Sequence, residues 1–409
     1  MTDLTFSSLG VADALTSVLA AENYTHPTPI QAQTIPLILS GRDVLGLAQT
    51  GTGKTAAFGL PLLQKLAEER VAAGPNGVRA LILAPTRELA VQIDESLRNY
   101  GRNLKLRHAV ILGGVSENKQ INSMRQGVDV LVATPGRLLD LINRKHVRLG
   151  AATLLVIDEA DRMFDMGFIK DVKRIVSHMP RARQSMLFSA TMPGEVAHLV
   201  NDILHQPARV AVTPEKVTAD HVEQRVYYVN VQDKRLLLHD LLRDPAMKRV
   251  IVFTRTKHGA NKVTDQLSKT GHVADAIHGN KSQNARQRAL DDFRAGRLRI
   301  LVATDIAARG IDIDDVTHVI NYELPDVAES YVHRIGRTAR AGSGGIAIAF
   351  CAPDERDSLK AIERLVKQPL IAVNDAPPMQ KQPERTINYA KPRNKNRGFR
   401  GRRDTRRAA

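Results

Sequence analysis

The sequence predicts an α/β protein of two domains, each a parallel β-sheet with helices on both faces. The chain has 409 residues, which is more than one ordinary hydrophobic core accommodates. Short runs rich in β-branched residues recur, each followed by a turn and a helical pattern, as in strands that alternate with helices. This rhythm occurs twice, on either side of a stretch with two prolines and no helical periodicity. Two related parallel-sheet domains are therefore expected.

The predicted strands are short apolar runs in both halves of the chain. Those of the first half are Asp43–Ala48, Ala80–Ala84, Val128–Ala133, Leu154–Ile157 and Gln184–Phe188. Those of the second half are Arg249–Phe253, His272–Ile277, Ile300–Ala303, His318–Tyr322 and Gly345–Cys351. We place the first domain at residues 1–206, a linker at 207–220 and the second domain at 221–368.

Residues 369–409 are predicted to form a disordered basic tail. From Lys381 onward there are eleven Lys or Arg against two acids, with almost nothing apolar. Such a segment cannot bury enough surface to fold alone.

Composition indicates a polyanionic partner. The net charge is +16 and the pI is near 10.0, and phosphate neutralisation with counterion release favours binding by such a chain. A generally basic surface is the alternative. Aromatic residues make up only 4%, so we expect contacts to the sugar–phosphate backbone rather than base stacking, and weak sequence preference.

Other composition signals exclude some classes of protein. No apolar run approaches the ~20 residues that span a bilayer, and the first residues lack the features of a signal peptide. Cys351 is the only cysteine, which excludes an intramolecular disulfide and a multi-cysteine zinc site. We interpret Cys351 as a small core residue, and we expect a cytoplasmic protein without membrane contact.

A glycine-rich loop predicts a phosphate site. Gly51-Thr52-Gly53-Lys54-Thr55 follows the strand Asp43–Ala48 and opens a helix. Glycines let backbone N–H groups wrap a phosphate, and the helix N-terminus adds positive potential. Lys54 then reaches the β- and γ-phosphates, while the Thr55 hydroxyl binds Mg²⁺. A purely structural glycine loop is the alternative.

A carboxylate cluster predicts the rest of the chemistry on the first domain. Asp158-Glu159-Ala160-Asp161 follows the strand Leu154–Ile157. At this edge of a parallel sheet we expect Asp158 to hold the Mg²⁺ of bound ATP and Glu159 to orient and deprotonate the attacking water. A solvated helix start, whose dipole favours acids, is the alternative.

An arginine-rich segment predicts a contribution from the second domain. His333–Arg340 contains three arginines, and Arg337 and Arg340 stand three apart, on one face of a helical turn. Reaching the γ-phosphate, they would act as arginine fingers. Taken alone, these residues fit a basic surface helix equally well.

Together these segments resemble the DEAD-box RNA helicases of superfamily 2, over nearly all of residues 1–368. The motifs that carry the resemblance, in order, are Pro27–Gln31 with upstream Phe6, Ala48–Thr55, Pro85–Leu89, Gly113-Gly114, Thr134–Arg137, Asp158–Asp161, Ser189–Thr191, Ile251–Thr254, Gln283 with Arg286, Ala303–Asp312 and His333–Arg340. The resemblance implies two tandem RecA-like domains. Within the family, the compact core and short basic tail are most similar to the bacterial RhlE-like group.

The resemblance implies further site residues. Phe6, Gln31, Thr50 and Asp312 would bind ATP, with Gln31 reading the adenine edge, Phe6 stacking on the ring and Asp312 contacting the ribose. Ser189 and Thr191 would couple the nucleotide site to the RNA face. RNA backbone would contact Thr86, Arg87, Gly114, Thr134, Arg137, Thr254, Gly279, Thr304 and Arg309. For the threonines and glycines among these, capping and turn roles are the alternative.

The chain departs from the family pattern at two glycine positions. Asn23 stands at the first, and because Asn tolerates positive φ we expect the turn to survive. Ala339 stands at the second. A positive φ there would strain Ala339 and misplace Arg340, whereas a helical φ would be harmless. We expect the helical case.

These observations predict an ATP-dependent RNA helicase that locally unwinds short duplexes or remodels RNA–protein complexes. An ATP-gated RNA clamp or annealing scaffold shares every motif and remains the alternative. Gln31 and Asp158–Asp161 disfavour a DNA translocase of the same superfamily. We expect a monomer, for which ribosome-assembly and RNA-decay complexes are both suitable partners.

Overall fold

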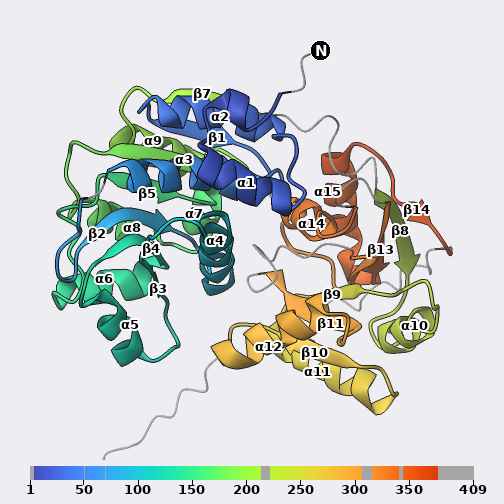
Figure 1. Ribbon diagram of the computed structural model, residues 1–409. Coiled ribbons are helices and arrows are strands. Elements are labelled where there is room, and N and C mark those ends of the chain that lie inside the picture. Colours follow the sequence, from blue (N-terminus) through green and yellow to red (C-terminus); the bar gives the residue numbers. More distant parts are fainter. Residues whose placement is uncertain are drawn as a thin grey trace, which may run out of the picture.

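The computed structural model describes residues 4–49, 51–69, 71–212, 222–305, 316–339 and 344–375. They form two seven-stranded sheets, one in each half of the chain (Figure 1). The paired strands within each sheet run parallel. This confirms the predicted fold class, two parallel-sheet α/β domains.

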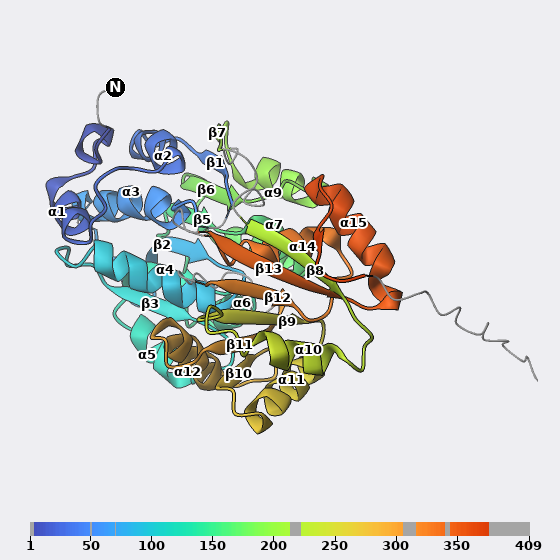
Figure 2. The ribbon, with the colours of Figure 1, turned by 90° about the vertical axis from the view of Figure 1, so that its right-hand side faces the viewer.

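The two sheets have the same strand order. The first is β3-β4-β2-β5-β6-β1-β7 and the second is β10-β11-β9-β12-β13-β8-β14, so each strand of the second takes the place of the strand seven earlier (Figure 2). The strands of the first sheet are β1 Val44–Leu47, β2 Val78–Leu83, β3 His108–Ile111, β4 Val128–Ala133, β5 Leu154–Ile157, β6 Gln184–Ser189 and β7 Ala208–Ala211. Those of the second are β8 Val222–Tyr228, β9 Val250–Thr254, β10 Ala274–Ile277, β11 Ile300–Thr304, β12 His318–Asn321, β13 Gly345–Cys351 and β14 Ile371–Ala372.

Helices cover both faces of each sheet (Figures 1 and 2). In the first half they are α1 Asp13–Ala21, α2 Pro29–Leu39, α3 Lys54–Glu68, α4 Arg87–Tyr100, α5 Glu117–Met124, α6 Pro135–Asn143, α7 Ala160–Asp165, α8 Ile169–Val176 and α9 Gly194–Ile203, with the 3₁₀ helix η1 Ser7–Leu9. In the second half they are α10 Lys234–Leu241, α11 Lys257–Lys269, α12 Gln283–Arg294, α14 Ala328–Ile335 and α15 Arg356–Val366, with η3 Pro353–Glu355.

The cores lie between the sheets and these helices. Ala80 and Ile82 of β2 pack in the cluster that contains α2, α3 and α4, while Leu81 and Leu83 pack in the cluster of α6, α8 and α9. Successive side chains of a strand point to opposite faces, so a strand that is apolar throughout is buried on both. Such runs were the ones the sequence predicted as strands.

Four strands were not predicted, namely β3, β7, β8 and β14. Strands β3, β7 and β14 lie at sheet edges, and β8 alternates buried residues with polar ones. Two predicted boundaries are therefore wrong. Strand β7 lies within the range predicted as linker, and β14 lies within the range predicted as tail, where Asn374 exchanges two hydrogen bonds with the Tyr228 backbone, both at 2.8 Å. Residues 213–220 of the predicted linker and 376–409 of the predicted tail lie outside the described residues.

The two departures from glycine have different outcomes. Asn23 has φ 61°, as expected of a residue that tolerates the left-handed region. Ala339 has φ 54°, so the expected helical conformation is wrong. The turn that follows α14 needs positive φ at this position, and a Cβ there costs about 1–2 kcal/mol.

Among the described residues, no helix combines the length and the apolar character needed to cross a membrane.

Candidate active site

The glycine loop after β1 adopts the backbone that its sequence requires. Gly51 and Gly53 have φ of 86° and 89°, in the region that a side chain disfavours. A Cβ at Gly53 would also collide with the Gln31 side-chain amide. Lys54 begins α3, is only 6% exposed and donates from Nζ to the Ala48 carbonyl at 2.9 Å. Thr50 lies outside the described residues.

The start of helix α2 is hydrogen-bonded to this loop. Thr28 and Gln31 form a capping box at its start, and the Thr28 Oγ1 hydroxyl donates to the Thr52 carbonyl at 2.8 Å. Gln31 Nε2 donates to the Gly53 carbonyl at 3.1 Å. The segment predicted to read adenine therefore also holds the phosphate loop, a role that spacing did not reveal. Phe6, predicted to stack on adenine, packs in the hydrophobic core and is 4% exposed.

Two buried carboxylates follow β5. Asp158 is 2% exposed and its Oδ1 accepts the Glu159 N–H at 2.9 Å. Burial raises the pKa of Asp158 to about 6, against the opposing pull of Lys54. Burial also acts on Glu159, but Arg162, Lys54 and Arg337 outweigh it and hold the pKa of Glu159 below its usual value.

Glu159 is held in a strained and paired conformation. Its φ and ψ are 52° and 56°, in the left-handed region, at the N-cap of α7. Its Oε2 forms an ion pair with Arg162 Nη1 at 3.0 Å, and both side chains are under 10% exposed. The backbone strain and the ion pair together fix the carboxylate beside Asp158.

A hydrogen-bonded cluster joins β6 to these carboxylates. Ser189 Oγ accepts the Asp161 N–H at 3.1 Å and donates to the Thr191 carbonyl at 2.7 Å. Asp161 Oδ2 in turn accepts from the Thr191 N–H at 2.8 Å and from its hydroxyl at 3.0 Å. A displacement of Ser189–Thr191 would therefore also displace the Asp158–Asp161 segment.

The second domain brings arginines to the same site. Arg337, just after α14, is 6% exposed and is close enough to Glu159 to lower its pKa. Arg334 serves the fold instead: it is 1% exposed, pairs with Asp305 at 2.6 Å and lies over the Phe253 ring. Arg340, Asp312 and Arg309 lie outside the described residues.

A buried contact between the domains was missed by sequence reasoning. Glu88, at the start of α4, is 2% exposed. Its carboxylate accepts from Gln283 Nε2 at 3.1 Å and pairs with Arg286 at 2.8 Å, both on α12 of the second domain. These residues belong to motifs noted above, but nothing in their spacing indicates that they meet across the cleft.

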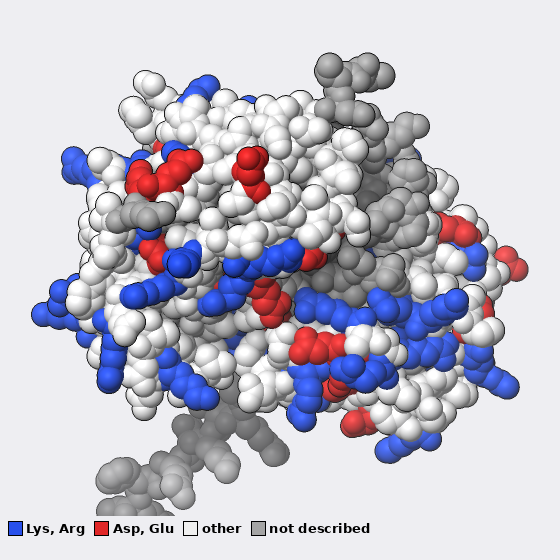
Figure 3. Space-filling model, in the orientation of Figure 1, with Lys and Arg blue, Asp and Glu red and all other residues white. Residues whose placement is uncertain are grey.

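The residues predicted to bind RNA lie at the carboxyl ends of neighbouring strands. In the first sheet they follow β2, β3 and β4, and in the second they follow or end β9, β10 and β11: Thr86, Arg87, Gly114, Thr134, Arg137, Thr254, Gly279 and Thr304. Thr86 and Thr134 are helix N-caps, and Gly114 has φ 76° where a Cβ would meet the Arg87 guanidinium. Lys and Arg side chains outnumber acids over the lower half of the face in Figure 3.

The carboxyl edge of the first sheet thus has two parts. One part carries Lys54, Asp158 and Ser189, and the other carries predicted RNA residues. In the second sheet, the corresponding strands carry the remaining predicted RNA residues. This is the arrangement of a phosphoryl-transfer enzyme that binds a polyanion across two domains.

Comparisons with known proteins identify the family. The DEAD/DEAH box helicase model matches residues 28–200, and the helicase conserved C-terminal domain model matches residues 233–342. The chain is 43% identical to the DEAD-box ATP-dependent RNA helicase CshA of Bacillus cereus over 375 residues, covering 91% of this chain and 70% of CshA. It is 45% identical to the RNA helicase CrhR of Synechocystis over 365 residues, covering 89% of this chain and 73% of CrhR.

A solved structure agrees. Saccharomyces cerevisiae Dbp5 bound to RNA and ADP BeF3 has a TM-score of 0.80 at 35% identity, covering 90% of this chain and 95% of that one. The chain belongs to the DEAD-box ATP-dependent RNA helicases, as the resemblance predicted.

Proposed function

We propose that this helicase separates short RNA duplexes locally, by closing its two domains around ATP and one RNA strand. The observation that carries the proposal is the buried Glu88–Arg286 ion pair, which joins the predicted RNA edges of the two sheets. Arg337 approaches Glu159 in the same arrangement. Dbp5, the neighbour described above, is bound to RNA and ADP BeF3. Closure would therefore assemble the ATP site and the RNA path in one step.

The proposed ATP chemistry uses residues of both domains. Lys54 holds the β- and γ-phosphates, with Gly51, Thr52, Gly53 and Thr50 around them. Glu159 orients the attacking water and accepts its proton. Arg337 and Arg340 stabilise the charge of the transferring phosphoryl group, and do so only in the closed form.

The residues near Lys54 fit a magnesium ion. Asp158 is a buried carboxylate whose pKa burial raises despite the nearby Lys54, so a bound cation would favour its ionised form further. Mg²⁺ is bound through one or two carboxylates with phosphates and waters, and no cluster of three or more His, Cys, Asp or Glu side chains is needed or found among the described residues. Asp158 and the Thr55 hydroxyl would hold it, and the ion would neutralise phosphate charge.

The remaining residues bind and couple the two ligands in this proposal. Gln31 and Phe6 select adenine, and Asp312 contacts the ribose. Ser189 and Thr191 transmit closure through Asp161, consistent with the Asp161 N–H that Ser189 accepts and the hydroxyl that Thr191 donates to the Asp161 carboxylate. The RNA backbone lies on the predicted set that runs from Thr86 to Arg309.

Several finer assignments belong to the same proposal. We place the division into domains between β7 and β8, with the first domain ATP-binding. The matched relatives reported above are CshA and CrhR, so they lend no support to an RhlE-like subgroup. We propose a cytoplasmic monomer whose basic tail tethers RNA, acting on ribosome-assembly or RNA-decay substrates.

The test measures coupling and strand separation together. RNA should tighten ATP binding by the same factor as ATP tightens RNA binding. Glu88→Gln should lower both factors equally, by about tenfold within the usual range of coupling, while exposed Glu195→Gln on α9 changes neither. A labelled short duplex should separate in the presence of ATP. Strong coupling without any strand separation would instead support the ATP-gated clamp.

A further inference from the structure

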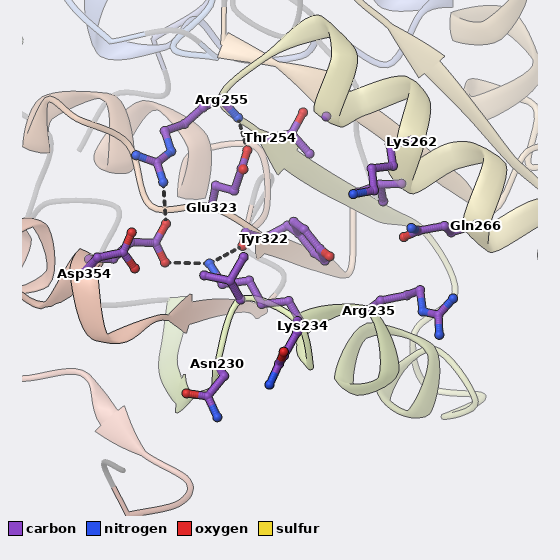
Figure 4. Close-up of a pocket in the computed structure, with 15 residues that line it drawn as sticks. Asn230, Lys234, Arg235, Thr254, Arg255, Lys262, Gln266, Tyr322, Glu323 and Asp354 are labelled. Carbon is purple, nitrogen blue, oxygen red and sulfur yellow. Dashed lines mark hydrogen bonds and ion pairs between the residues drawn. The ribbon is translucent and has the colours of Figure 1, made fainter. Parts of the chain in front are cut away.

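A pocket lies in the second domain, and none of the residues proposed above to bind ATP or to act in hydrolysis lines it. Its volume is about 670 Å³, within the range of small-molecule sites (Figure 4). Tyr322 lies at its centre, with Lys262 and Gln266 of α11 on one side and the start of α10 on the other. Thr254, at the carboxyl end of β9, also lines it.

This pocket is the counterpart of the ATP site in the second sheet. Strand β8 takes the place of β1, and β12 takes the place of β5. Lys234 therefore begins α10 as Lys54 begins α3, and Glu323 stands two residues past β12 as Glu159 stands two past β5. Strands β9 and β12 are neighbours, and the chain continues from β9 toward the β10 edge but from β12 toward β13, so the strand order reverses between them. Such switch points are where α/β sheets bind ligands.

The counterpart cannot hold a triphosphate as the first site would. The loop before α10 has no positive-φ glycine, and the Asp233 and Lys234 N–H groups are both spent on the Asn230 carbonyl, at 3.0 and 3.2 Å. Lys234 Nζ is 2.5 Å from Glu355 Oε2 and also donates to the Tyr322 carbonyl. The Lys234 ammonium is thus paired with the protein's own Glu355 carboxylate and cannot serve a phosphate. The rest of the pocket stays open.

The open part has the groups that recognise one nucleotide. Lys262 and Arg235 are exposed cations that form no ion pair with any described residue, and a phosphate attracts both. Tyr322 packs against Phe350 and has Lys234 Nζ 5.9 Å from its ring centroid, and it offers the part of its ring that lines the pocket. The Gln266 amide and the Asn230 side-chain oxygen offer hydrogen-bonding groups for a base edge. We propose that this pocket binds a single ribonucleotide unit, with its phosphate on Lys262 and Arg235 and its base against Tyr322.

Charge sets the strength of this binding. Glu355 is neutralised by Lys234 and by Arg255 at 3.0 Å, and Glu323 accepts the Arg255 N–H at 2.7 Å. Asp354 stays exposed at the rim. Lys262 points toward Tyr322 from the side opposite Asp354, and Arg235 lies farther out (Figure 4). The acids of the pocket oppose an anion, so we expect binding weaker than at the ATP site. The required base and phosphate could come from a free mononucleotide. They could equally come from a nucleotide of an RNA strand that continues past Thr254 into the pocket.

The test uses the full chain with Lys262→Gln, and Lys269→Gln near the end of the same helix as the matched control. In equilibrium dialysis, labelled ADP should bind in two classes, and Lys262→Gln should weaken only the weaker class, by about tenfold, or 1.4 kcal/mol. If the source is RNA, Lys262→Gln should bind a long single strand with a slope of log binding constant against log salt concentration that is smaller by ~0.7. Its binding of a short strand should be unchanged. Lys262→Arg should retain both behaviours.

The outcomes separate the two sources and the rival partner. A change in the ADP class alone assigns a free nucleotide, and a change with long RNA alone assigns an RNA strand. The proposal is overturned if Lys262→Gln matches Lys269→Gln in both assays. It is equally overturned if polyglutamate binds in a Lys262-dependent way while neither nucleotide assay responds, because the pocket then serves an acidic protein. ATPase activity with short RNA should be unchanged in every variant, which keeps this test independent of the helicase mechanism.

Discussion

The loop after β1 and the loop after β8 occupy the same position in two sheets of identical strand order, and each delivers a lysine to the start of the next helix. In the first sheet, Gly51 and Gly53 have positive φ, and Lys54 Nζ donates to the Ala48 carbonyl beside Asp158 and Glu159. In the second sheet, the loop N–H groups are spent and Lys234 is neutralised by Glu355. The same topology thus places a lysine at both positions, but the second lysine is paired with a carboxylate of the protein itself.

In the proposed mechanism the second domain contributes Arg337 and Arg340 to the first site, and the largest effect is expected there. Arg337→Ala should leave ATP affinity without RNA within a few-fold but lower RNA-stimulated turnover by about 10³–10⁵, as for other arginine fingers. Steady-state hydrolysis with and without RNA checks this, with exposed Arg364→Ala on α15 as control. Near-normal stimulated turnover would assign Arg337 a purely structural role. The same result is expected for Arg340→Ala.

The two glutamates that follow β5 and β12 test whether the equivalent positions differ in chemistry. Glu159→Gln removes the proposed base and should lower turnover by about 10²–10⁴, while ATP and RNA still bind. Glu323→Gln keeps its acceptor for the Arg255 N–H at 2.7 Å and should leave turnover within a few-fold. Single-turnover hydrolysis with measured ATP affinity separates the two variants. Equal losses in both would mean that the second edge takes part in hydrolysis.

The two lysines should differ in what their loss affects. Lys234→Met leaves Glu355 with one cationic partner fewer in a buried site and should destabilise the second domain by about 3–5 kcal/mol. Replacing both, as Lys234→Met with Glu355→Gln, should recover part of that loss, because Gln removes the buried charge and its amide oxygen can still accept a buried backbone N–H, as Glu355 does from Leu324 and Ala352. Urea unfolding followed by a probe in the second domain measures this, with exposed Lys360→Met as control. Lys54→Ala should instead impair ATP binding or hydrolysis and leave that unfolding transition unchanged.

The sequence predicted the apolar strands that lead into the candidate site better than it predicted the sheet edges. Gly51–Thr55 and Asp158–Asp161 follow apolar strands, and local chemistry alone required those residue types there. Strand β8 was missed because Glu223, Gln224 and Arg225 interrupt its apolar pattern, although it lies inside the second sheet. The Glu88–Arg286 pair was missed because it joins residues far apart in the chain, and only the fold brings them together.

The pocket around Tyr322 was missed for a related reason. Its loop carries no glycine signature, and its lysine is recognisable only once the two sheets are superposed by strand order. Ala339 shows the opposite failure. Its residue type was noticed, but whether it takes a helical or a left-handed conformation depends on how α14 ends and on the loop that follows, which no local rule decides.

The smallest expected effect concerns that residue, where the second domain carries a strained turn beside its arginines. Ala339 has φ 54°, which costs about 1–2 kcal/mol for a residue with a Cβ. Glycine removes this cost, but its greater backbone freedom stabilises the unfolded chain by about 0.4–1 kcal/mol. Ala339→Gly should therefore stabilise the domain by roughly 0.5–1 kcal/mol. Exposed Ala361, inside α15, is the matched control, because the same change there should destabilise by about 1 kcal/mol. Unfolding in urea should therefore shift in opposite directions for the two variants. Shifts of the same sign would mean that the turn tolerates a side chain without strain, and a rise in RNA-stimulated turnover for Ala339→Gly alone would show that the strain had misplaced the arginines.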